Sequence, residues 1–496
     1  MTDELTISLT AAAVVAPVLV ALVLQVARNE RTAHRLNRVG AAITAIVGLG
    51  AAAAMLTRES HATSWVIADT ASGIYVGVVT VIALMSALLS PAYLSGAQGE
   101  FFAARRSVRS YYLMLYGFWA ALVAIPLVAN LGVGLLVVEA TTAASSVLVA
   151  FSGKPRALEA GWKYLILTTL GMSLAFLGIV IMFVASAAPG GGIGQLDWSA
   201  LPLTLAHMPH DAAVAAYALV MLGLATKIGW APVHNWLPDA HSEAPAPVSA
   251  MLSSALLPTV MLLAWRLRDA ASGAIGNTAA TMPLAAFGIF SVAVAVPFLW
   301  QPMAWKRLLA YHSLEHMGII TVGIAIGGPL ALAGVVLHFA GHALAKALGF
   351  YAAIPLYQIQ PDAARHSARD VAAASPATFA AMAVCAFTLA GLPPSPLFFS
   401  ELFIILGGIQ SGQVLLASTL AVLIALAFIG LLHALLEALQ GTPGQDSQPT
   451  PTIRRDRTAP ILTPTLLTAA ALAALTACAW LLPASGIVRL LAQGIA

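Results

Sequence analysis

The stretch GLATKIGWAPVHNWLPDAHSEAPAPVSA, residues 223–250, decides the fold. It begins as an apolar helix and ends in a segment that combines four prolines with polar residues, namely Pro232, Pro238, Pro245, Pro247, His234, Asp239, His241, Ser242 and Glu243. Because proline removes a backbone donor and clashes with the preceding turn, we expect the helix to break between Lys227 and Pro238. Broken backbone at bilayer depth is tolerated only where it is buried in protein or lines a watery cavity.

Lys227 is the charged residue of the helical part, and it has no aqueous flank on its N-terminal side. A lysine at the centre of a membrane span costs about 2.5–3.5 kcal/mol on insertion scales, and such residues usually mark ion pathways. The alternative is a lysine that snorkels from a helix end. The prolines and acids that follow directly favour the pathway.

The composition places this stretch in a membrane. Hydrophobic residues make up 60% of the chain and charged residues 9%, and the mean hydropathy is +0.90. Soluble domains carry about 25% charged residues, so we predict a polytopic membrane protein in the lipid bilayer, with no nucleic-acid partner. Cys385 and Cys478 lie in apolar runs, and the chain has no Walker loop, GxGxxG after a strand, or HExxH. We therefore predict no metal, cofactor or redox centre in this chain.

Apolar runs of about 20 residues predict an all-α fold with fourteen membrane spans. We treat residues 1–496 as one transmembrane domain, and the acidic start MTDELTISLT, without a basic n-region, predicts that the first span is retained. The expected spans are near 5–27, 39–57, 72–96, 110–129, 131–152, 161–186, 212–231, 246–266, 280–300, 307–327, 330–355, 374–409, 413–439 and 460–483.

Basic residues set the orientation of these spans. Sixteen Lys and Arg fall in connections after odd-numbered spans, four fall on the opposite side, and Lys163, Lys227 and Lys346 lie within spans. The positive-inside rule then predicts that both termini face the periplasm or exterior of an inner (plasma) membrane. This orientation predicts that the connection at about 441–458 is a cytoplasmic linker, which is either a plain loop or an interface with a neighbouring subunit.

Two spans contain internal breaks. The seventh breaks at Lys227–Pro238 and the twelfth at GLPPSP, residues 391–396. They lie five spans apart, an odd number, so the two broken helices run in opposite directions. Interrupted segments at matching places in two halves are a pointer to inverted repeats and a transport site. We expect the repeats at about 110–266 and 280–439.

The segment ATKIGWAPVHNWLPDAHSEAPAPVSAML, with VEATT around Glu139, resembles the proton-translocating antiporter-like membrane subunits of complex I, Mrp antiporters and group 4 hydrogenases. PDAHSEAPAPVSA is most similar to the branch formed by the F subunits of hydrogenase-4. The resemblance implies two inverted five-helix units at spans 4–8 and 9–13, and a pair between Glu139 and Lys227. It also implies that Glu401, in LFFSELFII, ends a horizontal proton path. The alternative to this pairing is that Glu139 has a structural role and caps a neighbouring helix.

Further titratable residues lie on the tenth and eleventh spans. His338, His342 and Lys346 are spaced four and four, so they share one stripe of a helix, and imidazoles suit a proton relay. A metal on that face is disfavoured, because no carboxylate or thiol lies there and the lysine repels a cation. His312, Glu315 and His316 either join the path or pair with Lys306 or Arg307. Additional candidates are Lys163, as part of the axis or a snorkelling lysine, and His234, Asp239, His241 and Glu243.

Pro258 is a departure from the resembled family, several of whose members have a lysine in the eighth span. Here the run MLSSALLPTV leaves a gap between Lys227 and His338. We expect water to bridge it, in a polar cavity lined by residues such as Ser253, Ser254 or Thr259.

Together these features predict a subunit that moves protons, with Na⁺ as the less favoured ion, within a redox-driven complex resembling complex I or a group 4 hydrogenase. The partners are other membrane subunits of that assembly, which hold the redox chemistry. Two alternatives stay open. One is a cation/proton antiporter or ion-uptake module without redox partners, and the other is a non-conducting assembly scaffold, which the absence of a titratable side chain at Pro258 favours.

Overall fold

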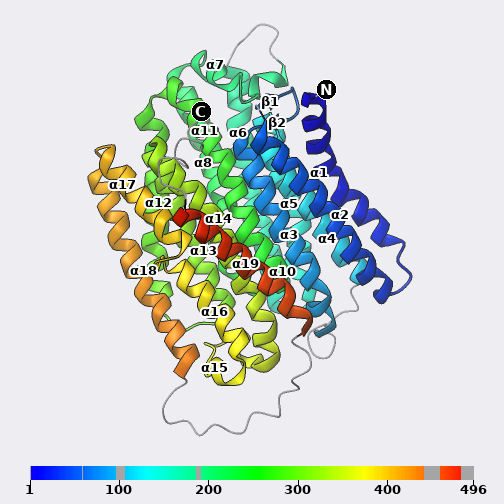
Figure 1. The fold of residues 1–496 in the computed structure, drawn as a ribbon. Coiled ribbons are helices and arrows are strands. Elements are labelled where there is room, and N and C mark those ends of the chain that lie inside the picture. Colours follow the sequence, from blue (N-terminus) through cyan, green and yellow to red (C-terminus); the bar gives the residue numbers. More distant parts are fainter. Residues whose placement is uncertain (1, 59, 97–106, 186–191, 441–458, 482–496) are drawn as a thin grey trace.

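The computed structural model describes residues 2–58, 60–96, 107–185, 192–440 and 459–481, and it is a bundle of long helices (Figure 1). Twelve helices of the described chain are long and apolar enough to cross a membrane. This confirms the predicted all-α membrane fold. The predicted connection 441–458 lies outside the described residues.

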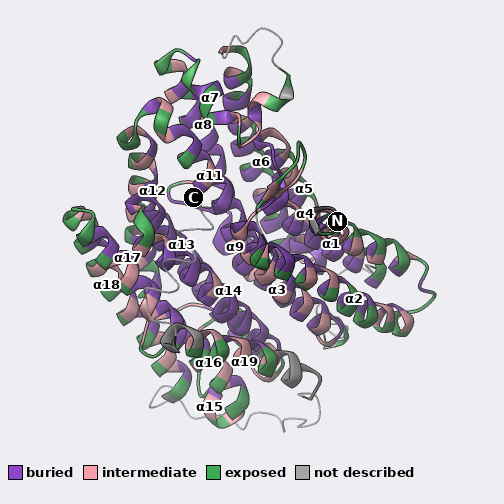
Figure 2. Cartoon of the chain, turned by 45° about the horizontal axis from the view of Figure 1, so that its top comes forward, coloured by how far each residue is buried: buried purple, intermediate pink, exposed green. Residues whose placement is uncertain are grey.

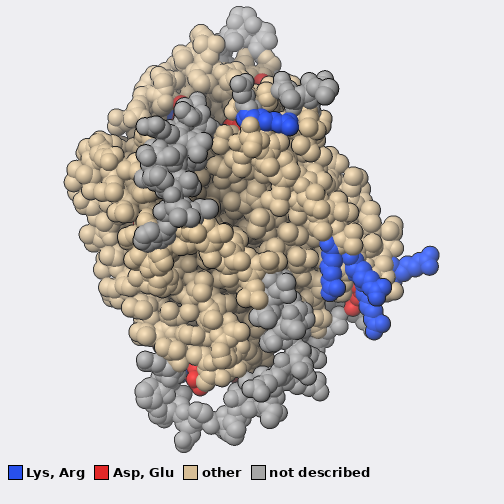
Figure 3. Space-filling model, viewed as in Figure 1, with Lys and Arg blue, Asp and Glu red and all other residues tan. Residues whose placement is uncertain are grey.

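The N-terminal part consists of α1 (Thr2–Gln25), α2 (Glu30–Thr57) and α3 (Thr70–Gly96), with a two-stranded hairpin of β1 (His61–Ala62) and β2 (Ile67–Ala68) before α3. Figure 3 shows basic side chains gathered over the end of the α1–α2 pair, where the chain carries Arg28, Arg31 and Arg35. Most of the remaining surface in this view is uncharged, as expected of a wall that faces lipid.

The next group contains residues 223–250 and the helices that surround them. Its members are α4 (Val108–Leu127), α5 (Leu131–Val149), η1 (Ala150–Ser152), α6 (Pro155–Ala185), η2 (Ile193–Leu196), α7 (Leu201–Ala206), α8 (His210–Ile228), α9 (Leu237–Glu243), α10 (Ala246–Met251), η3 (Leu252–Leu256) and α11 (Leu257–Ile275).

The C-terminal group contains the second predicted break. It consists of α12 (Asn277–Leu299), α13 (Trp305–Ile326), α14 (Gly328–Ile359), η4 (Pro361–Ala364), α15 (Val371–Ala374), α16 (Pro376–Leu389), α17 (Pro396–Gln410) and α18 (Val414–Gln440), followed by α19 (Ala459–Leu481). The predicted twelfth span is the pair α16–α17, and the fourteenth is α19. Figure 1 shows α19 crossing the bundle obliquely over α14.

The predicted break of the seventh span follows from local backbone chemistry. α8 ends at Ile228, because Gly229 adopts a left-handed conformation (φ +79°) and Pro232 follows. The indole of Trp236 donates to the Thr226 carbonyl at 2.7 Å, which satisfies one acceptor that the broken helix leaves free. The chain resumes as α9 and α10, each with proline in its first turn.

The twelfth span breaks in the same way. α16 ends at Leu389, Gly391 is left-handed (φ +61°), and α17 begins after Ser395, whose side chain accepts the Phe398 N–H. Both predicted interruptions are therefore present in the structure.

The core runs through the middle of the bundle. The most apolar windows of Ala246–Ile275 and α13 are entirely buried, whereas those of α1 and α18 are about one quarter buried (28%). Figure 2 shows this contrast as buried inner helices within a partly exposed outer wall. The inner titratable residues of these helices therefore lie away from lipid and bulk water, namely His312, Glu315 and His316 on α13 and His338, His342 and Lys346 on α14.

Candidate functional site

Lys227 is fully buried on the last turn of α8, where it reaches two hydroxyl groups on neighbouring helices. Its Nζ donates to Thr142 Oγ1 at 2.7 Å and to Tyr164 Oη at 2.6 Å, and it lies 4.6 Å from the centre of the Tyr164 ring. The ammonium is thus held by two charge-assisted hydrogen bonds and a cation–π contact.

Close packing of α6 against α8 makes this reach possible. A Cβ on Gly223 would lie 2.7 Å from the Gly171 carbonyl, so the two backbones touch where both residues are glycine. Small residues at such crossings let membrane helices approach closely. A larger residue at either position would push Tyr164 away from Lys227.

Glu139 joins Lys227 through a hydroxyl rather than directly. Thr142 Oγ1, which accepts from Lys227, lies 3.3 Å from Glu139 Oε2, and Thr169 Oγ1 donates to Glu139 Oε1 at 2.5 Å. Among the described residues, no ion pair within 4.0 Å links Glu139 and Lys227. The carboxylate is half-buried, and Thr169 is exposed, so Glu139 lies toward the outer wall of the bundle.

His241 lies between the Lys227 region and α14. Its ring is buried, with Nδ1 bonded to the Leu237 carbonyl at 2.9 Å and Nε2 lacking a protein partner. The ring centre lies 6.1 Å from that of Trp236, which packs on Tyr164, and 6.1 Å from that of Phe350 on α14. Folding therefore gives His241 a central position between the two halves.

The other candidates from residues 223–250 and their neighbours lie nearer the surface. Lys163 pairs with Glu159 and lies 3.8 Å from Asp239, which also pairs with Arg307 at 3.0 Å. This places Lys163 in an ion-pair network at the bundle surface. His234 is half-buried, with Nδ1 lacking a protein partner.

Lys306 is buried at the start of α13, where it holds the end of α9. Its Nζ donates to the carbonyls of Ser242 and Ala244, which a short helix leaves without intrahelical partners. Glu243 lies beside these carbonyls on the wall of a cavity of about 570 Å³ that also contains Lys154 and Arg365.

His312, Glu315 and His316 are buried on α13. His312 Nδ1 lies 2.7 Å from Glu315 Oε2, so this pair forms within the helix rather than with Lys306 or Arg307. His316 Nδ1 lies 2.9 Å from His338 Nε2 on α14, and His338 Nδ1 lies 2.9 Å from Ser400 Oγ on α17. A chain of hydrogen bonds therefore connects α13, α14 and α17.

His342 and Lys346 continue the stripe on α14. Neither ring nitrogen of His342 has a protein partner, and its ring centre lies 5.1 Å from that of His316. Lys346 Nζ donates to the Leu309 carbonyl. Buried polar atoms are normally hydrogen-bonded, so these free nitrogens predict internal water or mobile protons.

Glu401 is buried on α17 against the helix break. A Cβ on Gly391 would lie 2.4 Å from Glu401 Oε2, so the carboxylate occupies the space that glycine leaves. Its position next to Ser400 brings it to the end of the histidine chain.

Pro258 follows a π-helical turn, η3, in which the Leu257 N–H bonds to the Leu252 carbonyl. Single π-turns within helices often occur at functional sites. Ser253 bonds to Ser313 at 2.7 Å, whereas the buried hydroxyls of Ser254 and Thr259 have no protein partner. The region is polar, as expected, and the predicted water-filled cavity stays a prediction.

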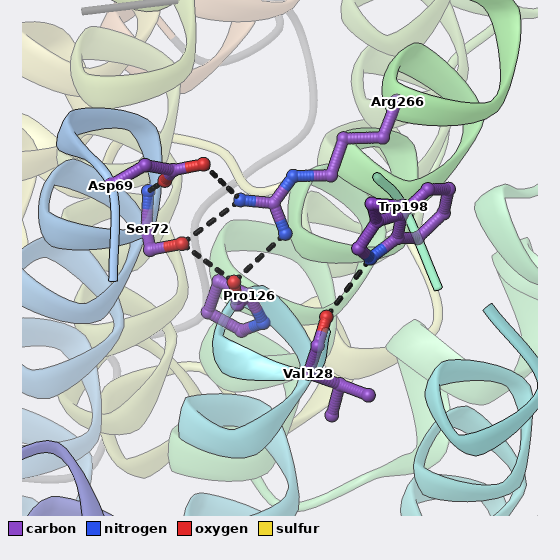
Figure 4. Close-up of polar contacts among 6 residues, drawn as sticks. All are labelled: Asp69, Ser72, Pro126, Val128, Trp198 and Arg266. Carbon is purple, nitrogen blue, oxygen red and sulfur yellow. Dashed lines mark hydrogen bonds and ion pairs between the residues drawn. The ribbon is translucent and has the colours of Figure 1, made fainter. Parts of the chain in front are cut away.

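A second polar cluster lies at the end of the bundle that carries the β-hairpin (Figure 4). Arg266 on α11 donates to Asp69 Oδ2 at 2.7 Å, to Ser72 Oγ at 2.9 Å and to the Pro126 carbonyl at 2.9 Å. These bonds join α11 to α3 and α4, and they fix the helix that follows Pro258.

Sequence reasoning missed the uncharged members of the site. Thr142 lies three residues after Glu139, so helical spacing could have identified it. Tyr164, Thr169 and Ser400 come from other helices, and a single sequence gives no signal that they meet these charges.

Comparisons with known proteins show which family and fold this chain shares. The family model described as "NADH:quinone oxidoreductase/Mrp antiporter, TM" matches residues 128–427. A hydrogenase-4 component F homolog from Methylacidiphilum infernorum is 30% identical over 401 residues, which cover 80% of this chain and 83% of that protein. NADH-quinone oxidoreductase subunit N from Granulibacter bethesdensis is 31% identical over 312 residues, 60% of each chain.

Two solved structures share the fold. A chain of the Mrp complex from Dietzia sp. superposes with a TM-score of 0.79 at 19% identity, covering 98% of this chain and 97% of that one. A chain of the membrane-bound sulfane sulfur reductase, an archaeal respiratory membrane complex, gives 0.78 at 17% identity, covering 99% and 100%.

Proposed function

Since this chain belongs to the NADH:quinone oxidoreductase/Mrp antiporter transmembrane family, we propose that it moves protons across the membrane as one subunit of a redox-driven complex. The resemblance predicted from the sequence is confirmed, and the chain is a multi-pass, antiporter-like membrane subunit. The observation that carries the proposal is the series of buried titratable side chains that extends from Lys227 to Glu401.

The proposed route follows the order in which these groups lie across the bundle. It starts at Glu139 and Lys227, passes His241, and reaches Lys346 and His342 on α14. From there it continues through His316 and His338, which bonds to Ser400, and ends at Glu401 beside the break between α16 and α17. This order enters α14 at its Lys346 end, whereas the sequence predicted entry at His338. Water near Ser254 and Thr259 would provide a parallel connection.

Lys227 acts as the proton-holding group of the first half. Its two hydroxyl partners and the Glu139 carboxylate, one hydroxyl further away, stabilise the ammonium. If a change in the complex moves Glu139 away, the buried charge loses its carboxylate and the proton leaves toward His241. Moving one charge against 100 mV requires about 2.3 kcal/mol, so the energy comes from redox chemistry in other subunits.

The position of Glu139 supports partner subunits. It is half-buried beside Leu136, which is 59% exposed, on the wall of the bundle. A carboxylate facing lipid is costly, so we propose that a neighbouring membrane subunit of a complex I-like or group 4 hydrogenase-like assembly covers this wall.

We also propose that the two broken helices are matching elements of inverted repeats at about 110–266 and 280–439.

The basic residues support an orientation with both termini on the exterior side of the inner membrane. Reporter fusions test this orientation. A C-terminal fusion to alkaline phosphatase, which is active outside the cytoplasm, is expected to be active. A C-terminal fusion to a fluorescent protein that folds only in the cytoplasm is expected to be dark. The opposite pattern would reverse the topology.

Lys227→Ala tests the function. We expect proton pumping in vesicles to fall to background while the complex still assembles, because the variant removes the buried group that holds the proton in the proposed route. Lys163→Ala is the matched control, since Lys163 lies in the surface ion-pair network, and it should pump nearly normally. Normal pumping by Lys227→Ala would exclude the proposed route, and a wild-type complex that assembles without pumping would favour a scaffold.

A further inference from the structure

Three helices bring metal-binding atoms together inside the bundle. His316 on α13, His338 on α14 and Glu401 on α17 each offer one ligand atom, and these atoms all lie within 4.8 Å of one another. Both histidines are fully buried, and Glu401 is 7% exposed. Two imidazoles and one carboxylate are a ligand set that proteins use for Zn²⁺.

The hydrogen bonds determine which ring nitrogens are available. Ser400 Oγ donates its proton to the Leu397 carbonyl at 2.8 Å, so it accepts from His338 Nδ1. His338 Nε2 then carries a lone pair and accepts from His316 Nδ1. His316 Nε2 is left as a buried lone pair without a protein partner.

This arrangement is that of a metal-binding imidazole. A histidine that ligates a metal almost always donates its other N–H to a second group, which fixes the tautomer and the ring orientation. Ser400 does this for His338. Binding would exchange the hydrogen bond between the two rings for bonds from each ring to the metal, and the proton on His316 Nδ1 would move to the free Nε2 of the same ring.

The surroundings supply a further ligand. Both nitrogens of His342 are free of protein partners, and its ring centre lies 5.1 Å from that of His316. The Glu401 carboxylate touches Gly391 at the helix break, where Pro393 and Pro394 are exposed.

We propose that His316, His338 and Glu401 form a binding site for a divalent transition metal of the Zn²⁺ class. Imidazole and carboxylate ligands select such an ion over Na⁺, because nitrogen ligands bind borderline-soft metals. The metal occupies the lone pairs that carry protons in the route above. Zn²⁺ is therefore a reversible inhibitor of translocation, a consequence that rests on the proposed function.

The test measures binding separately from transport. The purified, chelator-treated complex in nanodiscs is titrated with ZnSO₄, and tightly bound zinc per chain is counted after gel filtration. The wild type is expected to hold one zinc more than Glu401→Gln or His338→Ala. His433→Ala, which removes an exposed histidine 3.9 Å from Glu437, should keep that zinc and serves as the matched control.

Two further variants sharpen the assignment. Ser400→Ala should bind zinc about 10–100-fold more weakly, the usual cost of removing an outer-shell partner. Glu315→Gln should bind normally, although His312, Glu315 and His316 also lie close enough to hold a metal. X-ray absorption of the bound zinc should show imidazole and carboxylate ligands.

Equal zinc content in the wild type, Glu401→Gln and His338→Ala would overturn the site. So would loss of zinc in Glu315→Gln with retention in Glu401→Gln. Inhibition is tested in wild-type vesicles, where added Zn²⁺ should stop pumping and EDTA restore it. Failure of zinc-free vesicles to pump would count against the proposed function, while the binding result would still decide the metal site.

Discussion

The buried polar atoms differ in their hydrogen bonding between two regions, one around Lys227 and one formed by the histidines of α13 and α14, here called the histidine region. Lys227 has defined partners in Thr142 and Tyr164. Of the ring nitrogens of His312, His316 and His342, four lack any protein partner. A saturated site holds a proton in one place, whereas free lone pairs can pass it on. We therefore propose that the first region controls proton release and that the second conducts protons.

Among the variants that test this comparison, Glu139→Ala is expected to cause the largest loss of proton pumping. It removes the carboxylate from the hydrogen-bonded chain that ends at Lys227, so proton pumping in vesicles should fall strongly while assembly persists. Glu437→Ala, on the α18 surface, is the matched control. If pumping stays normal, release does not depend on this carboxylate.

Tyr164→Phe is expected to have the next largest effect. It deletes one hydroxyl partner of the ammonium but keeps the ring, and a hydrogen bond to a charged group contributes about 1.5–3 kcal/mol. If the loss falls on the pumping barrier, the rate should drop roughly tenfold or more, since about 1.4 kcal/mol is tenfold.

The control for that variant is Tyr217→Phe, because Tyr217 Oη bonds to the Ala280 carbonyl, outside the route. A similar loss of pumping in both variants would point to general loosening of the bundle.

His342→Ala should lower pumping only partially. The hydrogen-bonded chain from His316 to His338 remains, and water can occupy the space that the ring vacates. A double variant, His342→Ala with His316→Ala, should lose much more than the sum of the two single losses if the rings act as alternatives. Additive effects in the vesicle assay would contradict the idea of a conducting region with spare capacity.

Pro258→Lys should change pumping least. It adds a proton-holding group between the two regions, and we expect assembly to be retained and the rate unchanged or modestly higher. A high-resolution map of the wild type should show water bonded to Ser254 and Thr259. A dry packing of apolar side chains there, together with loss of pumping on substitution, would disconnect this branch from the route.

Particular residues show how far the sequence reached. Pro232 and Pro238 act through the backbone of their own segment, so the break after Ile228 could be predicted with no knowledge of neighbours. Hydrophobic run lengths predicted the spans for the same reason. The i, i+4 spacing of His338, His342 and Lys346 likewise placed them on one helical stripe.

The sequence by itself determined the class of protein, the spans and the two breaks, because all of these depend on local composition and backbone chemistry. Only the tertiary structure decided which side chains from different helices contact one another. A metal was disfavoured from α14 alone, yet folding sets Glu401 of α17 and His316 of α13 beside His338. It also moved Lys163 to the surface and gave His241 a central position, because contacts between distant segments depend on how the helices pack.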